Sequence, residues 1–361
     1  MFNIKRQLSR LYSSSILGSL SLTGAWVAIL AARGYSLVEI GIAETVFHIV
    51  SLMFEIPSGV LADVFGKKKM LILSTLMAMI SDVIMILSCN LTMVCISIGF
   101  RALCFNFSSG SGDALAYDSL KLAGQEERFE RYEANQMTIW RVCDGLSTLC
   151  AGFALQIGHR LAYGASLVTG AVQLLVLASL HEVRVAPAQQ GSIGRRLISC
   201  LRESFGFLKQ ARRALGLMFC NSFVGAADTL LLFFLQARLP DRGIPAWALG
   251  PALLLMHTGG ILGSRLVLRL PKLGYRKVFA GAALLVLTGL LAEHSPLCWV
   301  MTLGGFLSAV GDDALQVRTN ALLQEMFPPE QRATLTSVES FTFSVIMIVL
   351  SPLAGFVFTW W

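Results

Sequence analysis

Long apolar runs, separated by short polar segments, cover most of the 361-residue chain. A helix needs about 20 apolar residues to cross a hydrocarbon core of roughly 30 Å. The runs lack the alternation of barrel strands, and each is longer than such a strand. The pattern therefore predicts eleven transmembrane helices. They cover residues 12–32, 36–58, 69–89, 91–117, 134–158, 161–180, 213–236, 246–270, 278–293, 296–323 and 334–360.

Composition agrees with this interpretation, because 55% of the residues are hydrophobic and only 14% are charged. A soluble globular protein of this size would need more polar surface. The sequence thus predicts an all-α integral membrane protein. The run at 12–32 is longer than a signal-peptide core and further spans follow it, so we expect it to be retained as a helix.

Lys and Arg residues gather on one side of the predicted spans. With the N-terminus inside, cytoplasmic segments hold 21 of the 29 basic residues, external segments hold 4 and the spans hold 4. This bias predicts a multi-pass protein of the cell (inner or plasma) membrane with a cytoplasmic N-terminus. The net charge of +7 then reflects topology and contact with membrane lipid, and indicates no nucleic-acid partner. Eight cysteines form no metal-binding pattern, so neither a metal nor a cofactor is expected.

The longest polar interruption divides the chain into two halves. We expect a six-helix bundle at 1–181, a cytoplasmic central loop at 182–212, and a bundle of about five helices at 213–361. Within the central loop, residues 198–208 are predicted to form a helix on the membrane surface.

The two halves resemble each other in sequence. The string "SGDALAYDSLKL" closes the fourth span and "GDDALQVRTNAL" closes the tenth. Asp113 matches Asp313, and Asp118 falls opposite Arg318. Two halves of like orientation around a long cytoplasmic loop are typical of a rocking transporter, whose binding site lies at the midplane between the halves.

The stretch "GVLADVFGKKK", which joins the second and third spans, contains Gly59, Asp63, Gly66, Lys67 and Lys68. Glycine tolerates positive φ and close backbone approach, as a tight reversal between two membrane helices requires. Lysines hold such a loop on the cytoplasmic side, and an Asp at the membrane edge can meet a helix N-terminus or a cation.

These five residues fit the pattern G, three residues, D, two residues, G and two basic residues. The pattern, its position, the six-helix first half and the weak repeat all resemble the major facilitator superfamily over nearly the whole chain. The strings "EIPSGVLADVFGKKK" and "DALAYDSLK" resemble a prokaryotic, drug-efflux-like group of that family. The resemblance implies two pseudo-symmetric helix bundles. It also implies that Asp63 latches the cytoplasmic side against the segment that follows Pro328-Pro329.

The resemblance further implies that the first, fourth, seventh and tenth spans line the substrate cavity. Polar and aromatic residues on those spans are therefore candidates for substrate contact, and each of them is equally explained by a hydrogen bond to a neighbouring helix. The candidates are Trp26, Asn106, Asn221, Asp228 and Gln316.

Charged groups within the spans are costly, so they need partners or a function. Glu44, His48, Ser51 and Glu55 lie on one face of the second span. They indicate either a proton path, since His titrates near neutral pH, or a stripe that hydrogen-bonds neighbouring helices. Glu55 leans to the structural role, because it belongs to the loop motif.

Two further pairs of charges complete the predicted charge relay. Arg101 resembles the arginine of a family motif for proton coupling, and Asp82 is a plausible countercharge. Arg141 and Asp144 can pair along one face of the fifth span. That span, "GLSTLCAGFAL", lacks the Gly-Pro motif typical of drug and proton antiporters.

Together these features predict a monomeric secondary active transporter that couples protons to the export of a small amphipathic compound. Two alternatives stay open, namely proton-coupled nutrient uptake and a non-transporting scaffold or sensor derived from a transporter. No HxxxxD or HExxH arrangement supplies a base and nucleophile, so an enzyme is not expected. Members of the family usually have twelve spans, and the sequence ends in its eleventh, so either the twelfth helix is absent or the chain is truncated.

Overall fold

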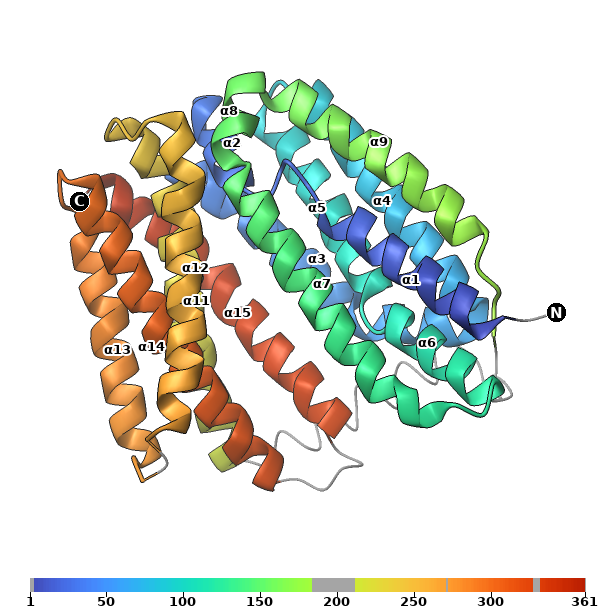
Figure 1. Cartoon of the computed structure of the whole chain (residues 1–361). Helices are drawn as coiled ribbons and strands as arrows, with labels where there is room; N and C mark the ends of the chain where they lie inside the picture. The colour runs from blue at the N-terminus through green and yellow to red at the C-terminus, as the bar shows by residue number, and fades with distance from the viewer. Residues whose placement is uncertain (1–2, 184–211, 271, 327–331, 361) are drawn as a thin grey trace. The chain divides into compact units, whose positions relative to one another are not determined.

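A computed structural model describes residues 3–183, 212–270, 272–326 and 332–360 (Figure 1). The predicted surface helix at 198–208 lies outside these residues, and so does the beginning of the segment after Pro328-Pro329. Fourteen α-helices and one short 3₁₀ helix, η1 (Glu126–Arg128), account for most of the described chain, and no strand occurs in it. The prediction of an all-α protein is confirmed. Eight of the described helical segments are long and apolar enough to cross a membrane.

Contacts divide the chain into two compact units. Unit 1 comprises Met1–Gly24, Ile49–Ser147 and Ile157–Arg202, and unit 2 comprises Ala25–His48, Thr148–Gln156 and Glu203–Trp361. One boundary falls inside a single long helix, α3 (Leu37–Phe65). The two ends of that helix therefore take their neighbours from different units.

In unit 1, α4 lies against both α5 and α9, and α1 packs on α9 and α6 (Figure 1). Asn side chains cap two of these helices, because Asn3 accepts from the amide of Arg6 and Asn90 accepts from the amide of Met93. Such caps satisfy amide donors that have no partner within the helix. The helices of this unit are α1 (Ile4–Ser19), α4 (Lys67–Leu87), α5 (Leu91–Ser108), α6 (Ser111–Leu122), α7 (Phe129–Leu149) and α9 (His159–Ala178), with the second part of α3.

In unit 2, α14 lies against α11, α12 and α13, while α15 and α2 pack on α11. A Ser36–Glu39 capping box starts α3. Ser36 Oγ accepts from the amide of Glu39 at 3.3 Å, and Glu39 Oε2 accepts from the amide of Ser36 at 2.8 Å. The remaining helices of this unit are α2 (Trp26–Ala32), α8 (Ala151–Ile157), α11 (Arg212–Asp241), α12 (Ala246–Leu268), α13 (Tyr275–Ala292), α14 (Cys298–Met326) and α15 (Arg332–Trp360).

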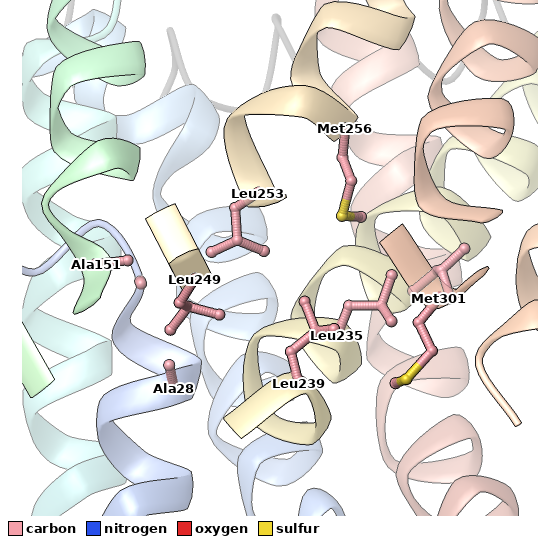
Figure 2. Packing of buried hydrophobic residues seen from close by; sticks show 10 residues of the cluster. Ala28, Ala151, Leu235, Leu239, Leu249, Leu253, Met256 and Met301 are labelled. Atoms are coloured by element: carbon pink, nitrogen blue, oxygen red, sulfur yellow. The ribbon is translucent and has the colours of Figure 1, made fainter. Parts of the chain in front are cut away.

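The core of unit 2 is built from leucines at helical spacing on α11. Leu231, Leu235 and Leu239 are fully buried and meet Leu249 and Leu253 of α12 (Figure 2). Close approach of α12 to α14 depends on glycine. A Cβ built at Gly263 would lie 2.1 Å from the carbonyl oxygen of Val310. Small residues of this kind let membrane helices pack backbone against backbone.

Three predicted spans are interrupted in the structure. The run at 12–32 forms α1 and α2, the run at 134–158 forms α7 and α8, and the run at 91–117 bends between α5 and α6. At the last break Gly110 has φ +69°, which ends α5 and starts α6. At the first break, the amide of Ser21 donates to Ser147 Oγ at 3.0 Å. At this break a side chain of a neighbouring helix thus satisfies a freed backbone amide.

Candidate functional site

A buried histidine in α3 joins two polar side chains of unit 2. His48 Nε2 lies 3.1 Å from Glu44 Oε1, one helical turn away, and His48 Nδ1 lies 3.2 Å from Ser344 Oγ of α15. Glu44 is 8% exposed and His48 is 6% exposed. Helical spacing predicts the contact between Glu44 and His48, whereas Ser344 comes from a segment about 300 residues away.

The residues of the predicted polar stripe on α3 form hydrogen bonds with two separate groups of neighbours. Ser51 donates to Asn106 Oδ1 at 3.2 Å, and Asn106 Nδ2 donates to the carbonyl of Ser51 at 3.0 Å. These two bonds lie within unit 1, while Glu44 and His48 bond within unit 2. Asn106 is 1% exposed, so its amide serves the contact between α3 and α5. Glu55 is half-buried, and its backbone carbonyl accepts from Ser58.

Three carboxylates of α11 and α14 gather in unit 2. Asp228 Oδ1 accepts from Ser308 Oγ at 2.5 Å. Asp312 and Asp313 lie close enough to Asp228 to repel it electrostatically. Three carboxylates so placed concentrate negative charge, which favours the approach of a cation.

Glycines on the facing helices make room for this acidic cluster. A Cβ at Gly260 of α12 would lie 2.2 Å from Asp313 Oδ2, and a Cβ at Gly225 of α11 would lie 3.3 Å from Asp312 Oδ1. The sequence repeat pointed to Asp313, and the position of Asp228 on the seventh span made it a candidate for substrate contact, but Asp312 was missed. The Gly-Asp-Asp string of α14 was the available signal, because two adjacent acids in a span are costly.

An aromatic ring lies between the histidine and the acidic cluster. The ring of Phe343 on α15 is 5.6 Å from the His48 ring, centroid to centroid, and 3.8 Å from a Cβ built at Gly225. One turn before Phe343, Glu339 accepts from Asn221 Nδ2 at 3.3 Å. Polar side chains of α3, α11, α14 and α15 therefore lie near one another within unit 2.

Two other predicted substrate contacts differ in their surroundings. Trp26 packs edge-on against Phe233 of α11, with ring centroids 5.4 Å apart. Phe233 lies on the same helix as Asp228, whereas Trp26 begins α2. Gln316 is exposed.

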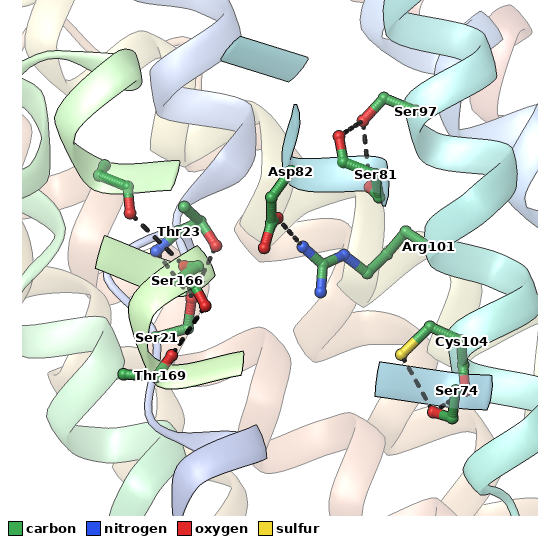
Figure 3. A network of polar contacts seen from close by, with 11 residues as sticks. Ser21, Thr23, Ser74, Ser81, Asp82, Ser97, Arg101, Cys104, Ser166 and Thr169 are labelled. Carbon is green, nitrogen blue, oxygen red and sulfur yellow. Dashed lines mark hydrogen bonds and ion pairs between the residues drawn. The ribbon is translucent and has the colours of Figure 1, made fainter. Parts of the chain in front are cut away.

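In unit 1, Arg101 of α5 forms an ion pair with Asp82 of α4 (Figure 3). Asp82 is buried, and Arg101 is half-buried. The pair borders a cavity of about 50 Å³, which is also lined by Ser21, Thr169 and other residues of α1 and α9. The countercharge expected from the sequence is therefore present.

The pair predicted within the fifth span is not formed. Among the ion pairs of the described residues, none joins Arg141 to Asp144. The Arg141 guanidinium instead lies over the ring of Trp140, 5.0 Å from its centroid. A cation and an aromatic face attract each other, and this contact takes the place of the expected one.

The loop motif is organised by groups that the sequence pattern did not identify. Gly66 has φ +105° and precedes α4. Both oxygens of Glu182 accept from the first α4 amides, those of Lys67 and Lys68, at 3.0 Å each. Lys67 also forms an ion pair with Asp118. A carboxylate at a helix N-terminus satisfies amides that have no helical partner and interacts favourably with the helix dipole.

The other parts of the motif differ from expectation or lie outside the described side chains. Lys68 Nζ donates to the carbonyls of Ala178 and Leu180 at 2.7 Å each, at the end of α9. Gly59 lies inside α3 with no atom within 4 Å of an added Cβ, so no close backbone approach explains it. The side chain of Asp63 is not among those described.

A second charged cluster that sequence reasoning missed lies at the far end of α11. Arg238 Nε pairs with Glu293 Oε1 at 2.9 Å, and His294 Nδ1 lies 3.4 Å from Glu293 Oε2. Arg238 also donates to the carbonyl of Phe358 on α15. An acid at the end of a predicted span, opposite an external arginine, was the signal for this cluster.

In the described part of the chain, no group of three or more His, Cys, Asp and Glu side chains is arranged to hold a metal ion. The polar networks above consist of carboxylates, imidazole, hydroxyls and amides.

Comparison with known proteins identifies a family. The family model described as Major Facilitator Superfamily matches residues 11–305. An uncharacterized MFS-type transporter, YxaM of Bacillus subtilis (strain 168), is 24% identical over 352 residues, covering 92% of this chain and 84% of YxaM.

Solved transporter structures share the fold. The nucleoside transporter NupG has a TM-score of 0.75 at 16% identity, covering 99% of this chain and 91% of NupG. The D-xylose-proton symporter has a TM-score of 0.66 at 11% identity, covering 97% and 88% of the two chains. At these identities the structures establish a common architecture.

Proposed function

The chain belongs to the major facilitator superfamily of membrane transporters, and from this premise we propose that it couples protons to the export of a small amphipathic compound. The observation that carries the proposal is the buried network of Glu44, His48 and Ser344. Secondary transport of a small molecule follows from the family, whereas coupling, direction and substrate class are the proposal.

The network supports proton binding through its chemistry. A neutral imidazole has one N–H, so it donates to only one of its two neighbours. A protonated imidazole donates from both nitrogens, to the Glu44 carboxylate and to Ser344 Oγ. Proton uptake thereby turns a buried negative charge into a neutral ion pair. Binding of one proton and a rearrangement of α3 against α15 are linked in this way.

The acidic cluster supports a cationic, amphipathic substrate. Asp228, Asp312 and Asp313 concentrate negative charge on α11 and α14. The Trp26–Phe233 pair adds an aromatic contact between α2 and α11. Aromatic faces and carboxylates together attract organic cations. Exchange then requires that proton binding at Glu44 and His48 weakens the binding of such a cation at these carboxylates.

Alternating access is the working cycle in this proposal, with the chain as a monomer in the cell membrane and its N-terminus in the cytoplasm. We assign the cytoplasmic latch to Asp63, supported by its position in the loop motif. Asp63→Asn is expected to shift the labelling of introduced cysteines at the two membrane faces in opposite directions. Unchanged labelling at both faces would contradict this role.

The first test is binding, followed by flux. The melting temperature of the purified protein is measured with lipophilic cations, sugars, nucleosides and organic anions, since a ligand that binds only the folded state raises it. The compound that binds is then followed in proteoliposomes under an imposed pH gradient. Wild-type protein is expected to accumulate it only when the gradient is present.

Variants of the network separate coupling from binding. Glu44→Gln and His48→Ala are expected to abolish gradient-driven accumulation while the ligand still raises the melting temperature. His257→Ala is the matched control, because it removes another histidine from a span, α12, without touching the network. Gradient-driven transport that survives both substitutions at the level of the control overturns the proton-coupling proposal.

A further inference from the structure

A cavity unrelated to the polar networks lies in unit 1 between the start of α1 and the start of α7. The cavity has a volume of about 410 Å³, which falls within the range of volumes of small-molecule binding sites. Apolar side chains of α1 form part of its wall, because Leu8 and Ile16 both line it. The polar lining residues are Lys5, Tyr12, Arg128, Arg131, Tyr132 and Asn135, together with two serines.

The charged side chains that line this cavity, among the residues that the structure describes, are all cations: Lys5, Arg128 and Arg131. The carboxylates of Asp113 and Glu133 lie near Tyr132 but do not line the cavity. Within the described part of the chain, none of these three cations takes part in an ion pair. Arg128 Nη1 donates to Gln125 Oε1 at 2.6 Å, a neutral partner that orients the guanidinium and leaves its charge uncompensated. Three such cations around one cavity create a site for an anion.

Two stacked tyrosines supply further donors. The rings of Tyr12 and Tyr132 lie 5.1 Å apart, centroid to centroid. The Tyr12 hydroxyl accepts from Asn135 Nδ2 at 3.0 Å, and the Tyr132 hydroxyl accepts from Gln136 Nε2 at 2.5 Å. A hydroxyl that accepts in this way keeps its own proton to donate. A phenol is protonated at neutral pH, and burial raises the pKa of Tyr132 further.

The combination of groups narrows the class of anion. Guanidinium groups bind phosphate through paired N–H donors, and a lysine adds a point charge. An apolar wall beside the cations suits a molecule that carries a phosphate on a short hydrocarbon body. Lys5 and Arg131 are exposed, so the ligand can enter from solvent or from the headgroup layer. Basic pockets at the ends of membrane helices are suited to lipid headgroups.

We propose that this cavity binds a phosphate-bearing anion, supplied either by the headgroup of an anionic phospholipid or by a soluble phosphate ester. The site is independent of the proposed transport function, because it shares no residue with the networks of Glu44, Asp228 or Asp82. Occupancy ties the start of α1 to the start of α7, and therefore stabilises unit 1.

The test compares two sets of three cations in the full-length protein. Lys5→Gln, Arg128→Gln and Arg131→Gln are combined in one variant that removes the charges of the cavity. The control combines Arg269→Gln, Lys272→Gln and Arg276→Gln, which removes three exposed charges at the turn between α12 and α13 of unit 2. Melting temperatures are measured with phosphatidylglycerol, with phosphatidylcholine and with glycerol 3-phosphate, and bound lipids are counted by native mass spectrometry.

Wild-type and control proteins are expected to respond to phosphatidylglycerol with a raised melting temperature and one retained lipid. The cavity variant is expected to lose at least half of that response. Loss of the response to phosphatidylglycerol alone identifies the lipid as the source, and loss of a response to glycerol 3-phosphate identifies the soluble ester. An equal response in the cavity variant and the wild type, or equal losses in both variants, overturns the proposal.

Single substitutions guard against a folding defect. Lys5→Gln and Arg131→Gln change exposed side chains, so they are expected to fold, and each is expected to weaken lipid retention severalfold. Arg131→Lys keeps the charge and is expected to restore most of it. If Arg131→Lys and Arg131→Gln retain the lipid equally, the charge at position 131 does not contribute to lipid binding. That result would contradict the proposed site.

Discussion

Gly260 determines where the carboxylate of Asp313 lies. A methyl group at this position would sit 2.2 Å from Asp313 Oδ2, well inside van der Waals contact. The carboxylate is the far end of a side chain that can rotate away, so the fold itself tolerates the change. Gly260→Ala is therefore expected to displace Asp313 from the acidic cluster with little loss of stability.

We expect Gly260→Ala to weaken binding of a cationic substrate about tenfold, or about 1.4 kcal/mol. The matched control is Gly281→Ala in α13, where no atom lies within 4 Å of the added methyl group. Both variants are compared in the ligand melting assay. Equal affinity in the two variants would show that the position of Asp313 is not part of the substrate site.

The partners of single residues show what sequence can and cannot reveal. Glu44 and His48 are one helical turn apart, so their contact follows from the helix period alone. Asp82 was identified as a countercharge because an arginine in a span requires one. Ser344 and Glu182 escaped notice because they reach their partners only through tertiary packing. A serine and a loop glutamate carry no local signal of such a role.

At the scale of helices, the beginning of α4 depends on a residue that follows α9. Glu182 follows α9, and its two oxygens accept from the first two amides of α4. The lysines at the same place return the interaction, because Lys68 donates to the last carbonyls of α9. Each of the two helix ends thus meets a charge of the sign that its dipole favours.

Removing this cap tests its contribution to stability. Glu182→Ala is expected to cost about 1 kcal/mol, the usual effect of losing a helix N-cap. The melting temperature should fall by a few degrees, and Glu182→Gln should fall between Ala and wild type because it keeps acceptor capacity but loses charge. Glu127→Ala in the exposed η1 segment is the control. If Glu182→Ala and Glu127→Ala have the same melting temperature, the cap does not stabilise α4.

Helix existence was predictable from the sequence, but helix continuity was not. Apolar length alone predicted one span at 12–32 and one at 134–158, where the structure has a pair of helices each time. The breaks are stabilised by the contact of Ser21 with Ser147, which joins the two broken runs. Serine is compatible with a continuous membrane helix as well, so its presence did not reveal the interruption.

At the scale of the whole molecule, the sequence repeat has a physical counterpart in each unit. Asp118 near the end of α6 pairs with Lys67, which follows the second predicted span. At the matching position, Arg318 of α14 donates to the carbonyl of Leu270, which follows α12, at 2.9 Å. The charge has changed sign between the repeats, yet each joins the same two segments of its unit. The alignment of Asp118 with Arg318 therefore reflects a shared structural task.

Direction of transport is a property of the whole molecule, and membrane orientation tests it. In everted vesicles, export appears as accumulation in the lumen. If protons drive export, accumulation requires an acidic lumen, because protons leave as the substrate enters. A protonophore is expected to abolish this accumulation, and the Glu44→Gln protein is expected to show none.

The other arrangement separates the rival functions. Proton-coupled uptake would instead produce accumulation in right-side-out vesicles with an acidic exterior, and none in everted vesicles with an acidic lumen. A protein that only senses or scaffolds would raise its melting temperature with ligand and move none in either orientation. The export proposal requires the first pattern, because in proton-driven exchange the carrier takes up a proton outside as the substrate leaves and releases that proton to the cytoplasm as the next substrate binds.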